Sequence, residues 1–190
     1  MSYSSVQNRS KVHPHKFALL LGCASIVMMF AAWTSAYVVR QAAGNWLEFR
    51  LPNLFFINTA VILASSLTLH LSYRSFLNRQ ESLYKLFLFV TFILGFSFVA
   101  LQYVAWTKLK LIGVPLTKNP SGDFVYVLTG FHAAHVIGGI GVLTVALIHA
   151  FALKFSPSPK RKLRFELTLI YWHFVDALWL YLILFLVTQS

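Results

Sequence analysis

Residues 124–153 read FVYVLTGFHAAHVIGGIGVLTVALIHAFAL, and this stretch decides the fold. It contains no Asp, Glu, Lys or Arg. A helix of about 20 apolar residues is long enough to cross the roughly 30 Å hydrocarbon core of a bilayer. Because backbone N–H and C=O groups cannot stay unpaired in lipid, a spanning segment of this kind must be a helix. The stretch therefore predicts a transmembrane helix, and its extra length allows tilting or projection from the bilayer.

Four further apolar segments have the same character. The 190 residues are 58% hydrophobic and 11% charged, whereas soluble domains carry about 25% charged residues. The short alternating strands of a membrane β-barrel are not seen in the sequence. We therefore predict an all-α integral membrane bundle of five transmembrane helices, forming a single transmembrane domain over residues 1–190. The predicted spans are about 17–39, 53–73, 84–106, 124–153 and 165–188.

The basic residues indicate the orientation in the membrane. Lys and Arg number 16 against five acidic residues, for a net charge of +11. In a soluble protein this excess would suggest nucleic-acid binding. Here the basic residues lie between the apolar segments, where they act as topology signals and contact anionic headgroups. Eleven of the 16 fall on the side of the N-terminus and five on the other, which predicts a cytoplasmic N-terminus and a periplasmic C-terminus. The eleven are Arg9, Lys11, Lys16, Arg74, Arg79, Lys85, Lys154, Lys160, Arg161, Lys162 and Arg164; the five are Arg40, Arg50, Lys108, Lys110 and Lys118.

The first apolar segment is expected to stay in the mature protein as a span. It is too long for the core of a removable signal and lacks a clear small-residue cleavage site. It also holds Cys23, the one cysteine of the sequence. A single cysteine excludes an intrachain disulfide and a multi-thiolate metal site, so Cys23 is interpreted as a small buried apolar residue.

Polar residues inside the spans are the candidate functional residues, because they are costly in lipid. Asp176 lies near the middle of the fifth span, and His173, three residues earlier, shares its helix face. Glu166 continues this polar stripe toward the cytoplasm. In the fourth span, His132 and His135 lie among small residues that let another helix approach closely. We therefore expect the fourth and fifth spans to pack with their polar stripes facing each other.

Three roles for these residues are open on spacing alone. They could form hydrogen bonds that lock helices together, carry protons, or bind haem or a metal. The His132-x-x-His135 spacing lacks the acid of a zinc protease motif, and no cysteine or carboxylate cluster completes a metal site. Histidines on facing spans could still be axial haem ligands, with His70 and His149 as further candidates. Spacing favours the structural role and does not decide among them.

Two runs carry a resemblance to a known family. Residues 130–139 read GFHAAHVIGG, and residues 171–180 read YWHFVDALWL after Phe165-Glu166. They resemble the GFHxxHVxxG and FE…YWHFVDxxWL signatures of cytochrome c oxidase subunit III, the third subunit of haem–copper terminal oxidases. Fainter likenesses lie at Asn58-Thr59, Ser65-Ser66 and Leu101-Gln102. The chain looks like the short five-helix bacterial type, which lacks the first two helices of the seven-helix members.

The resemblance implies a non-catalytic subunit of a bacterial proton-pumping oxidase that passes electrons from cytochrome c to O2. It implies no catalytic residue and no metal bound by this chain, with the haem and copper held by the catalytic subunit, and it allows a bound phospholipid. Expected partners are oxidase subunit I by direct contact, subunit II, small subunits, membrane lipids and a respiratory supercomplex, in the bacterial cytoplasmic membrane. The expected role is to stabilise subunit I and to support proton uptake.

The resemblance also implies roles for individual residues. A structural or proton-linked polar cluster is expected at His132, His135, Glu166, His173 and Asp176. Packing positions of the family signature are expected at Gly130, Phe131, Gly138, Trp172, Trp179 and Gln102. One departure is Ile26, which occupies the place where the family often has a buried glutamate, so no role of that carboxylate is expected here.

Alternatives to this reading remain. Subunit III of a quinol oxidase is a near relative, because the electron-donor site would lie in other subunits. A haem-binding membrane cytochrome would use His132 or His135 together with His173. A small transporter or proton channel would use Asp176, although the sequence shows no inverted repeat.

Overall fold

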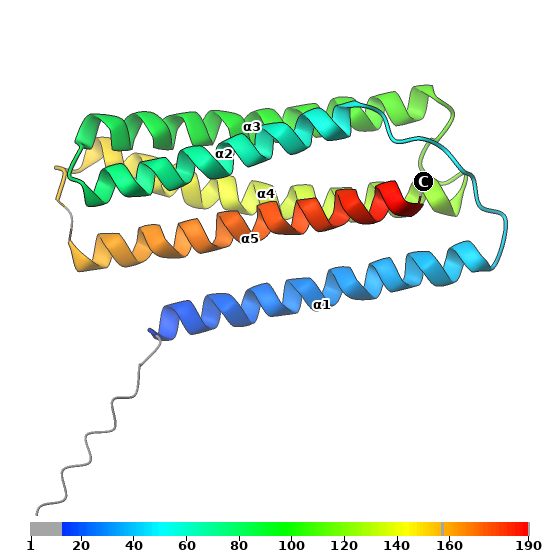
Figure 1. Cartoon of the computed structure of the whole chain (residues 1–190), viewed down its shortest axis with the longest axis horizontal. Coiled ribbons are helices and arrows are strands. Elements are labelled where there is room, and N and C mark those ends of the chain that lie inside the picture. The colour runs from blue at the N-terminus through cyan, green and yellow to red at the C-terminus, as the bar shows by residue number, and fades with distance from the viewer. Residues whose placement is uncertain (1–12, 157, 190) are drawn as a thin grey trace, which may run out of the picture.

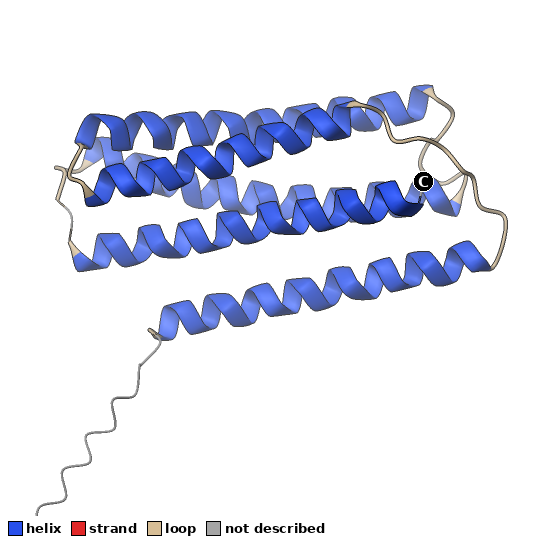
Figure 2. Ribbon diagram, viewed as in Figure 1, coloured by secondary structure: helices blue, strands red, loops and turns tan. Residues whose placement is uncertain are grey.

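The computed structural model describes residues 13–156 and 158–189, and its secondary structure is entirely helical (Figures 1 and 2). Each of its five helices is long and apolar enough to cross a membrane. The predicted all-α class with five spans is therefore confirmed. The helices are α1 (Pro14–Ala42), α2 (Leu54–Leu77), α3 (Glu81–Leu111), α4 (Pro120–Ala152) and α5 (Pro159–Gln189).

Local sequence sets where several helices begin. Pro14, Pro120 and Pro159 each stand at the first position of a helix, where the missing N–H is not needed and the fixed φ angle suits the helix. The Asn119 side chain accepts a hydrogen bond from Ser121 N at 3.0 Å and so caps α4. The helices mostly extend beyond the predicted spans, because a helix can continue past the hydrocarbon core into the headgroup region.

Helices α2 to α5 form a closed four-helix ring. The contacting pairs are α2 with α3, α3 with α4, α4 with α5, and α5 with α2. Short connections make successive helices antiparallel, as the ribbon in Figure 1 shows. Helix α1 lies outside this ring and packs on α4 and α5. The molecule is thus a four-helix bundle with one peripheral helix.

The centre of the bundle is built around Trp172. Its indole ring lies between two glycines on different helices: a Cβ placed on Gly95 would lie 2.8 Å from the ring, and one on Gly139 would lie 2.9 Å from it. Trp179 lies about two turns further along α5. Its ring meets the Phe98 ring edge-to-face, with ring centroids 4.9 Å apart. Small residues on α3 and α4 therefore let α5 insert its large side chains, which is the packing mode that membrane helices use.

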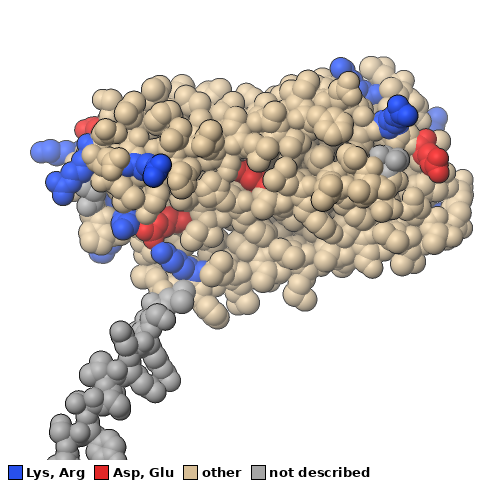
Figure 3. Space-filling model, viewed as in Figure 1, with Lys and Arg blue, Asp and Glu red and all other residues tan. Residues whose placement is uncertain are grey.

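The surface matches this interior. In the view of Figure 3, Lys and Arg gather at the two ends of the bundle, and a largely uncharged band lies between them. Many large apolar side chains of the helices are exposed, for example Met28 (73%) on α1 and Leu184 (67%) on α5. Such a surface suits a hydrocarbon environment and would be unusual in water.

Candidate functional site

Hydrogen bonds along one pair of helices organise the polar interior. Helices α2 and α5 run antiparallel, and side-chain contacts join them at three levels from Thr59 to Tyr73 of α2. The Trp179 indole donates to Thr59 Oγ1 at 3.0 Å, and the Trp172 indole donates to Ser65 Oγ at 3.0 Å. Further along, the Ser66 hydroxyl contacts His173 Nδ1, and the Tyr73 hydroxyl donates to Glu166 Oε1 at 2.9 Å. We call these four contacts the α2–α5 ladder.

Two hydroxyl groups of the ladder, those of Thr59 and Ser65, both donate and accept a hydrogen bond. Thr59 Oγ1 donates to the Phe55 carbonyl of its own helix at 2.9 Å, and Ser65 Oγ donates to the Ile62 carbonyl at 2.7 Å. Each oxygen therefore uses its proton within α2 and offers a lone pair to an indole N–H of α5. At these two contacts, indole donors of α5 are thus matched to hydroxyl acceptors of α2.

This arrangement differs from the expected facing of polar stripes on α4 and α5. Helix α5 turns its polar residues toward α2, and α4 offers glycine to Trp172 instead. His173 and Asp176 form no hydrogen bond with each other, although their spacing places them on one helix face: His173 Nδ1 contacts Ser66, and both Asp176 oxygens lack a partner in the described residues. The reason is that Trp172, Asp176 and Trp179 share the inward face of α5, while His173 is rotated toward the outside of the helix pair.

His132 and His135 diverge despite their short spacing. His132 is fully buried, with its ring 4.9 Å from the Trp179 ring and 5.8 Å from the Phe98 ring. Within the described residues neither of its nitrogens has a hydrogen-bond partner. His135 turns toward α1, where its ring lies 5.9 Å from Phe30, and its Nδ1 is 2.7 Å from the Phe131 carbonyl oxygen. The two histidines therefore have different surroundings and cannot act on one ligand as a pair.

Asp176 is the most unusual group of the interior. It is 3% exposed, and neither carboxyl oxygen has a hydrogen-bond partner in the part of the chain that the structure describes. The Ser66 side chain is a polar neighbour of this carboxyl group. An ionised carboxylate without a partner is very costly in a low-dielectric interior, whereas a neutral acid is tolerated. The geometry therefore suits a protonated Asp176.

Gln102 joins α3 to α2. The Asn58 Nδ2 donates to Gln102 Oε1 at 2.9 Å, and both side chains are fully buried. Helix α3 is joined to α4 in the same way, since the Trp106 indole donates to Thr129 Oγ1 at 2.9 Å. Each neighbouring pair of the ring except α4 with α5 thus carries a hydrogen bond between side chains.

The three remaining signature positions lie on α4. Phe131 packs edge-to-face on Trp33 of α1, with ring centroids 4.4 Å apart. A Cβ on Gly130 or Gly138 would make only ordinary contacts, at 3.9 Å and 3.7 Å. Within the run of residues 130–139, the close approach to Trp172 falls instead on Gly139, next to Gly138.

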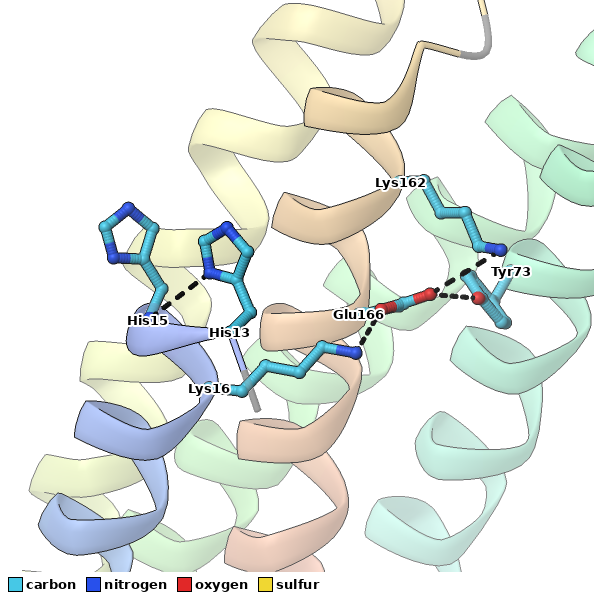
Figure 4. A network of polar contacts seen from close by, with 6 residues as sticks. All are labelled: His13, His15, Lys16, Tyr73, Lys162 and Glu166. Atoms are coloured by element: carbon cyan, nitrogen blue, oxygen red, sulfur yellow. Dashed lines mark hydrogen bonds and ion pairs between the residues drawn. The ribbon is translucent and has the colours of Figure 1, made fainter. Parts of the chain in front are cut away.

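Glu166 lies at the end of the bundle where α1 and α5 begin, and it joins three helices (Figure 4). Lys16 of α1 forms an ion pair with Glu166 Oε2 at 2.5 Å, and Lys162 of α5 lies 3.9 Å from Oε1. The third partner is Tyr73 of α2. Glu166 is therefore a connecting residue between α1, α2 and α5.

Sequence reasoning did not single out several residues of this site for a role. Thr59, Ser65 and Ser66 entered only as faint family likenesses, and Tyr73 and Gly95 did not enter at all. The usable signal was the spacing of the hydroxyl residues on α2, since Thr59, Ser66 and Tyr73 recur at seven-residue intervals on one helix face. Hydropathy hides this signal because Ser and Thr are only weakly polar on such scales.

Two further features concern the haem, metal and lipid hypotheses. His70 and His173 lie on adjacent helices with ring centroids 6.1 Å apart, but the described residues contain no group of three His, Cys, Asp or Glu side chains that could hold a metal ion. His149 lines a groove of about 830 Å³ between α1, α4 and α5. The walls of this groove are mainly apolar, and Arg161 and Arg164 lie at one end.

Comparison with known proteins gives the family. Residues 15–189 match the sequence model of the family described as Cytochrome c oxidase subunit III. A relative named "Probable cytochrome c oxidase subunit 3" from Nocardia farcinica (strain IFM 10152) is 33% identical over 173 residues, which cover 85% of this chain and 81% of the relative.

Two animal proteins named "Cytochrome c oxidase subunit 3" are also similar. The Gallus gallus protein is 38% identical over 128 residues and the Paracentrotus lividus protein is 42% identical over 130 residues. Each alignment covers 66% of this chain and 46% of the relative, so the chain spans about half the length of these relatives. The match over nearly the whole described bundle, with its signature residues at the helix contacts, means that this chain belongs to the cytochrome c oxidase subunit III family.

Proposed function

We propose that the chain is a non-catalytic subunit of a bacterial proton-pumping haem–copper oxidase that uses cytochrome c to reduce O2. One observation carries the proposal: the family signature residues of α4 and α5, above all Trp172, Trp179 and His132, form contacts between helices in the interior. Residues placed in this way build a scaffold for other subunits. Membership of the cytochrome c oxidase subunit III family indicates that this complex is a terminal oxidase.

In this proposal the haem and copper belong to the catalytic subunit I, which this chain contacts directly, and subunit II and small subunits complete the assembly. The chain lies in the bacterial cytoplasmic membrane as a multi-pass protein. Its N-terminus faces the cytoplasm, in agreement with the excess of Lys and Arg on that side. A supercomplex with other respiratory enzymes is an extension of the same proposal.

The polar residues of the helices divide into two roles under this proposal. His173, Glu166 and Gln102 are structural, because each has a partner on another helix. His132 and Asp176 are the proton-linked candidates, because their polar atoms have no partner in the described residues. A proton-linked role predicts that Asp176→Asn, which keeps the shape of the side chain, changes proton uptake during turnover while the complex still assembles. Unchanged proton uptake by an assembled Asp176→Asn complex would assign Asp176 a structural role.

The groove between α1, α4 and α5 supports a bound phospholipid. Its apolar walls suit acyl chains, and Arg161 and Arg164 suit an anionic headgroup. Native mass spectrometry of the detergent-purified complex would show a lipid adduct that Arg164→Gln weakens. An equal adduct in Arg164→Gln, and also in Arg161→Gln, would contradict a headgroup site at these arginines.

The decisive experiment is capture of the tagged chain in mild detergent, followed by reduced-minus-oxidised spectra before and after its partners are removed. The proposal expects a haem signal that stays with the partners and a colourless isolated chain. Haem that travels with this chain, and is lost in His173→Ala, would favour a membrane cytochrome instead. Oxygen uptake by the captured complex with reduced cytochrome c or with a quinol identifies the donor, and uptake only with quinol would replace cytochrome c by the quinol alternative.

A further inference from the structure

Exposed polar side chains on the membrane faces of this bundle are usually satisfied by their own helix. Ser25 Oγ donates to the Leu21 carbonyl at 3.1 Å, Ser97 Oγ to the Ile93 carbonyl at 2.8 Å, and Thr107 Oγ1 to the Tyr103 carbonyl at 3.1 Å. A hydroxyl bound in this way can face lipid at little cost. These positions therefore need no partner outside the chain.

His70 on α2 is different. It is exposed, and its contact within the described residues is the ring of His173, with centroids 6.1 Å apart. It lies three residues before the end of the predicted span of residues 53–73, which is roughly 4.5 Å along the helix axis. An imidazole at that position has two ring nitrogens to satisfy, and hydrocarbon offers neither of them a hydrogen-bond partner. His70 therefore requires a polar partner that lipid tails do not provide.

His70 is part of a larger polar group on this face. Ser66 lies one turn earlier on α2 and contacts His173 Nδ1, which leaves Nε2 of that histidine for another partner. Asp176 lies beneath, next to Ser66, with both carboxyl oxygens unpartnered in the described part of the chain. We call Ser66, His70, His173 and Asp176 the histidine cluster. Unsatisfied hydrogen-bonding capacity is thus concentrated where α2 meets α5.

Within the described chain His70 is exposed, whereas Asp176 of the same cluster is buried. Helix α1 packs on α4 and α5 and makes no contact with α2 along the helices. In Figure 1, α2 and α5 lie side by side, and Figure 3 shows on the same side of the molecule a largely uncharged band between the basic ends, with an acidic group visible near its middle. Ionisable residues inside a membrane almost always face protein or a water-filled cavity. The face is therefore suited to protein contact.

We propose that the histidine cluster is the docking face for a transmembrane helix of the partner oxidase subunit, and that this helix brings a carboxyl side chain to His70 and His173. A carboxyl group has two oxygens and can bridge two imidazoles whose rings are this far apart, with hydrogen bonds of about 2.8 Å. Interhelical hydrogen bonds of this kind are a normal means of association in lipid. The proposal rests on the proposed function, because it needs a partner subunit in the same membrane.

The test is photo-cross-linking in the full complex, captured through a tag on this chain. A photoreactive residue replaces Leu67, which is 62% exposed and lies one turn before His70. The matched control replaces Ile93, which is 46% exposed on α3. The two positions lie at similar depth, because Thr68 and Thr91 are hydrogen bonded at 2.8 Å between α2 and α3. The expected result is a partner-subunit adduct from position 67 that clearly exceeds the adduct from position 93.

The outcomes separate the two proposals. If no haem-containing subunit is captured with the chain, the proposed function fails. If such a subunit is captured but position 67 gives only lipid adducts, or no more partner adduct than position 93, the docking face is wrong while the function stands. As a second measurement, His70→Leu should lower partner retention during detergent washing by roughly threefold to tenfold, and His70→Gln should keep it near wild type. Full retention by His70→Leu would also overturn the proposal.

Discussion

Helices α2 to α5 and helix α1 are held in the molecule by different means. Within the four-helix bundle, side-chain hydrogen bonds link α2 to α3 and α5, and the Trp172 ring fills the space between two glycines. Helix α1 is attached by aromatic contacts, by the hydrogen bond of 2.7 Å between Thr34 and Tyr181, and by the ion pair of Lys16. In an apolar stretch of 18 residues of α1, 17% of the residues are buried inside the molecule, against 44% in the corresponding stretch of α5.

This difference teaches how cohesion arises in lipid. Lipid tails are as apolar as leucine, so apolar side chains alone give little net force between helices. Close packing and hydrogen bonds decide which helices stay together. Removal of one contact within the four-helix bundle should therefore lower the free energy of unfolding much more than removal of one contact that attaches α1.

The largest effect is expected for Trp172→Ala. The change removes a ring that is 1% exposed and its hydrogen bond to Ser65. We expect the free energy of unfolding of the purified chain, measured by denaturant titration in micelles, to fall by about 3 kcal/mol. The control is Trp33→Ala on α1, which should cost no more than about 1 kcal/mol. Equal losses for the two variants would contradict the contrast between bundle and peripheral helix.

Gly139→Ala should have the next largest effect. Its new Cβ would lie 2.9 Å from the Trp172 ring, and that ring cannot retreat because Gly95 holds its other side. We expect a loss of about 1–3 kcal/mol in the same titration. Gly141→Ala is the matched control, since nothing lies within 4 Å of its Cβ position. A Gly139→Ala chain as stable as the Gly141→Ala chain would show that the packing is looser than described.

Tyr181→Phe should have a smaller effect, on the attachment of α1. The variant loses the hydrogen bond to Thr34, although the Thr34 hydroxyl keeps the Phe30 carbonyl as a partner at 3.1 Å. We expect a loss of about 0.5–1 kcal/mol, together with faster hydrogen exchange in the second half of α1. Tyr103→Phe, at a position that is 69% exposed on α3, serves as control and should leave that exchange unchanged. Identical hydrogen exchange in both variants would show that the Thr34–Tyr181 hydrogen bond does not help to attach α1.

The smallest effect is expected for Lys16→Met. The ion pair with Glu166 is partly exposed, with 33% and 21% of the two side chains accessible, so it contributes at most about 1 kcal/mol. The expected change is faster hydrogen exchange confined to the first turns of α1. Lys85→Met removes a comparable ion pair within α3, with Glu81, and should not alter α1. A change in α1 exchange of the same size in Lys85→Met would mean that Lys16 has no special role.

The five spans could be predicted from the sequence because crossing a bilayer needs only length and apolar composition. The neighbours of each helix could not. The small residues of α4 were expected to receive polar side chains of α5, yet Gly139 receives Trp172. Hydropathy gives the same value to a glycine that faces an indole and to one that faces lipid. The closing contact of α5 with α2 depends on side-chain shape and register, which a hydropathy profile does not contain.

The candidate site shows the same limit. Asp176, Glu166 and the histidines were identifiable because they are ionisable residues inside spans. Their partners depend on rotation of each helix by about 100° per residue, so His173 and Asp176 point to different surroundings although they are three residues apart. His132 and His135 diverge for the same reason. Which residue has a partner, and which has none, required the packed structure.

The α2–α5 ladder has a consequence for biosynthesis. Trp172 follows Ser65 by 107 residues, so α2 waits in the membrane for roughly 5–20 seconds of translation before α5 is made. During that wait the hydroxyls of Thr59 and Ser65 are bound to carbonyls of their own helix and can face lipid without penalty. The indole groups of α5 then enter with free N–H groups that find acceptors already oriented on α2. Helix α5 thus closes the ring, and the nascent bundle is complete only when translation has passed this span.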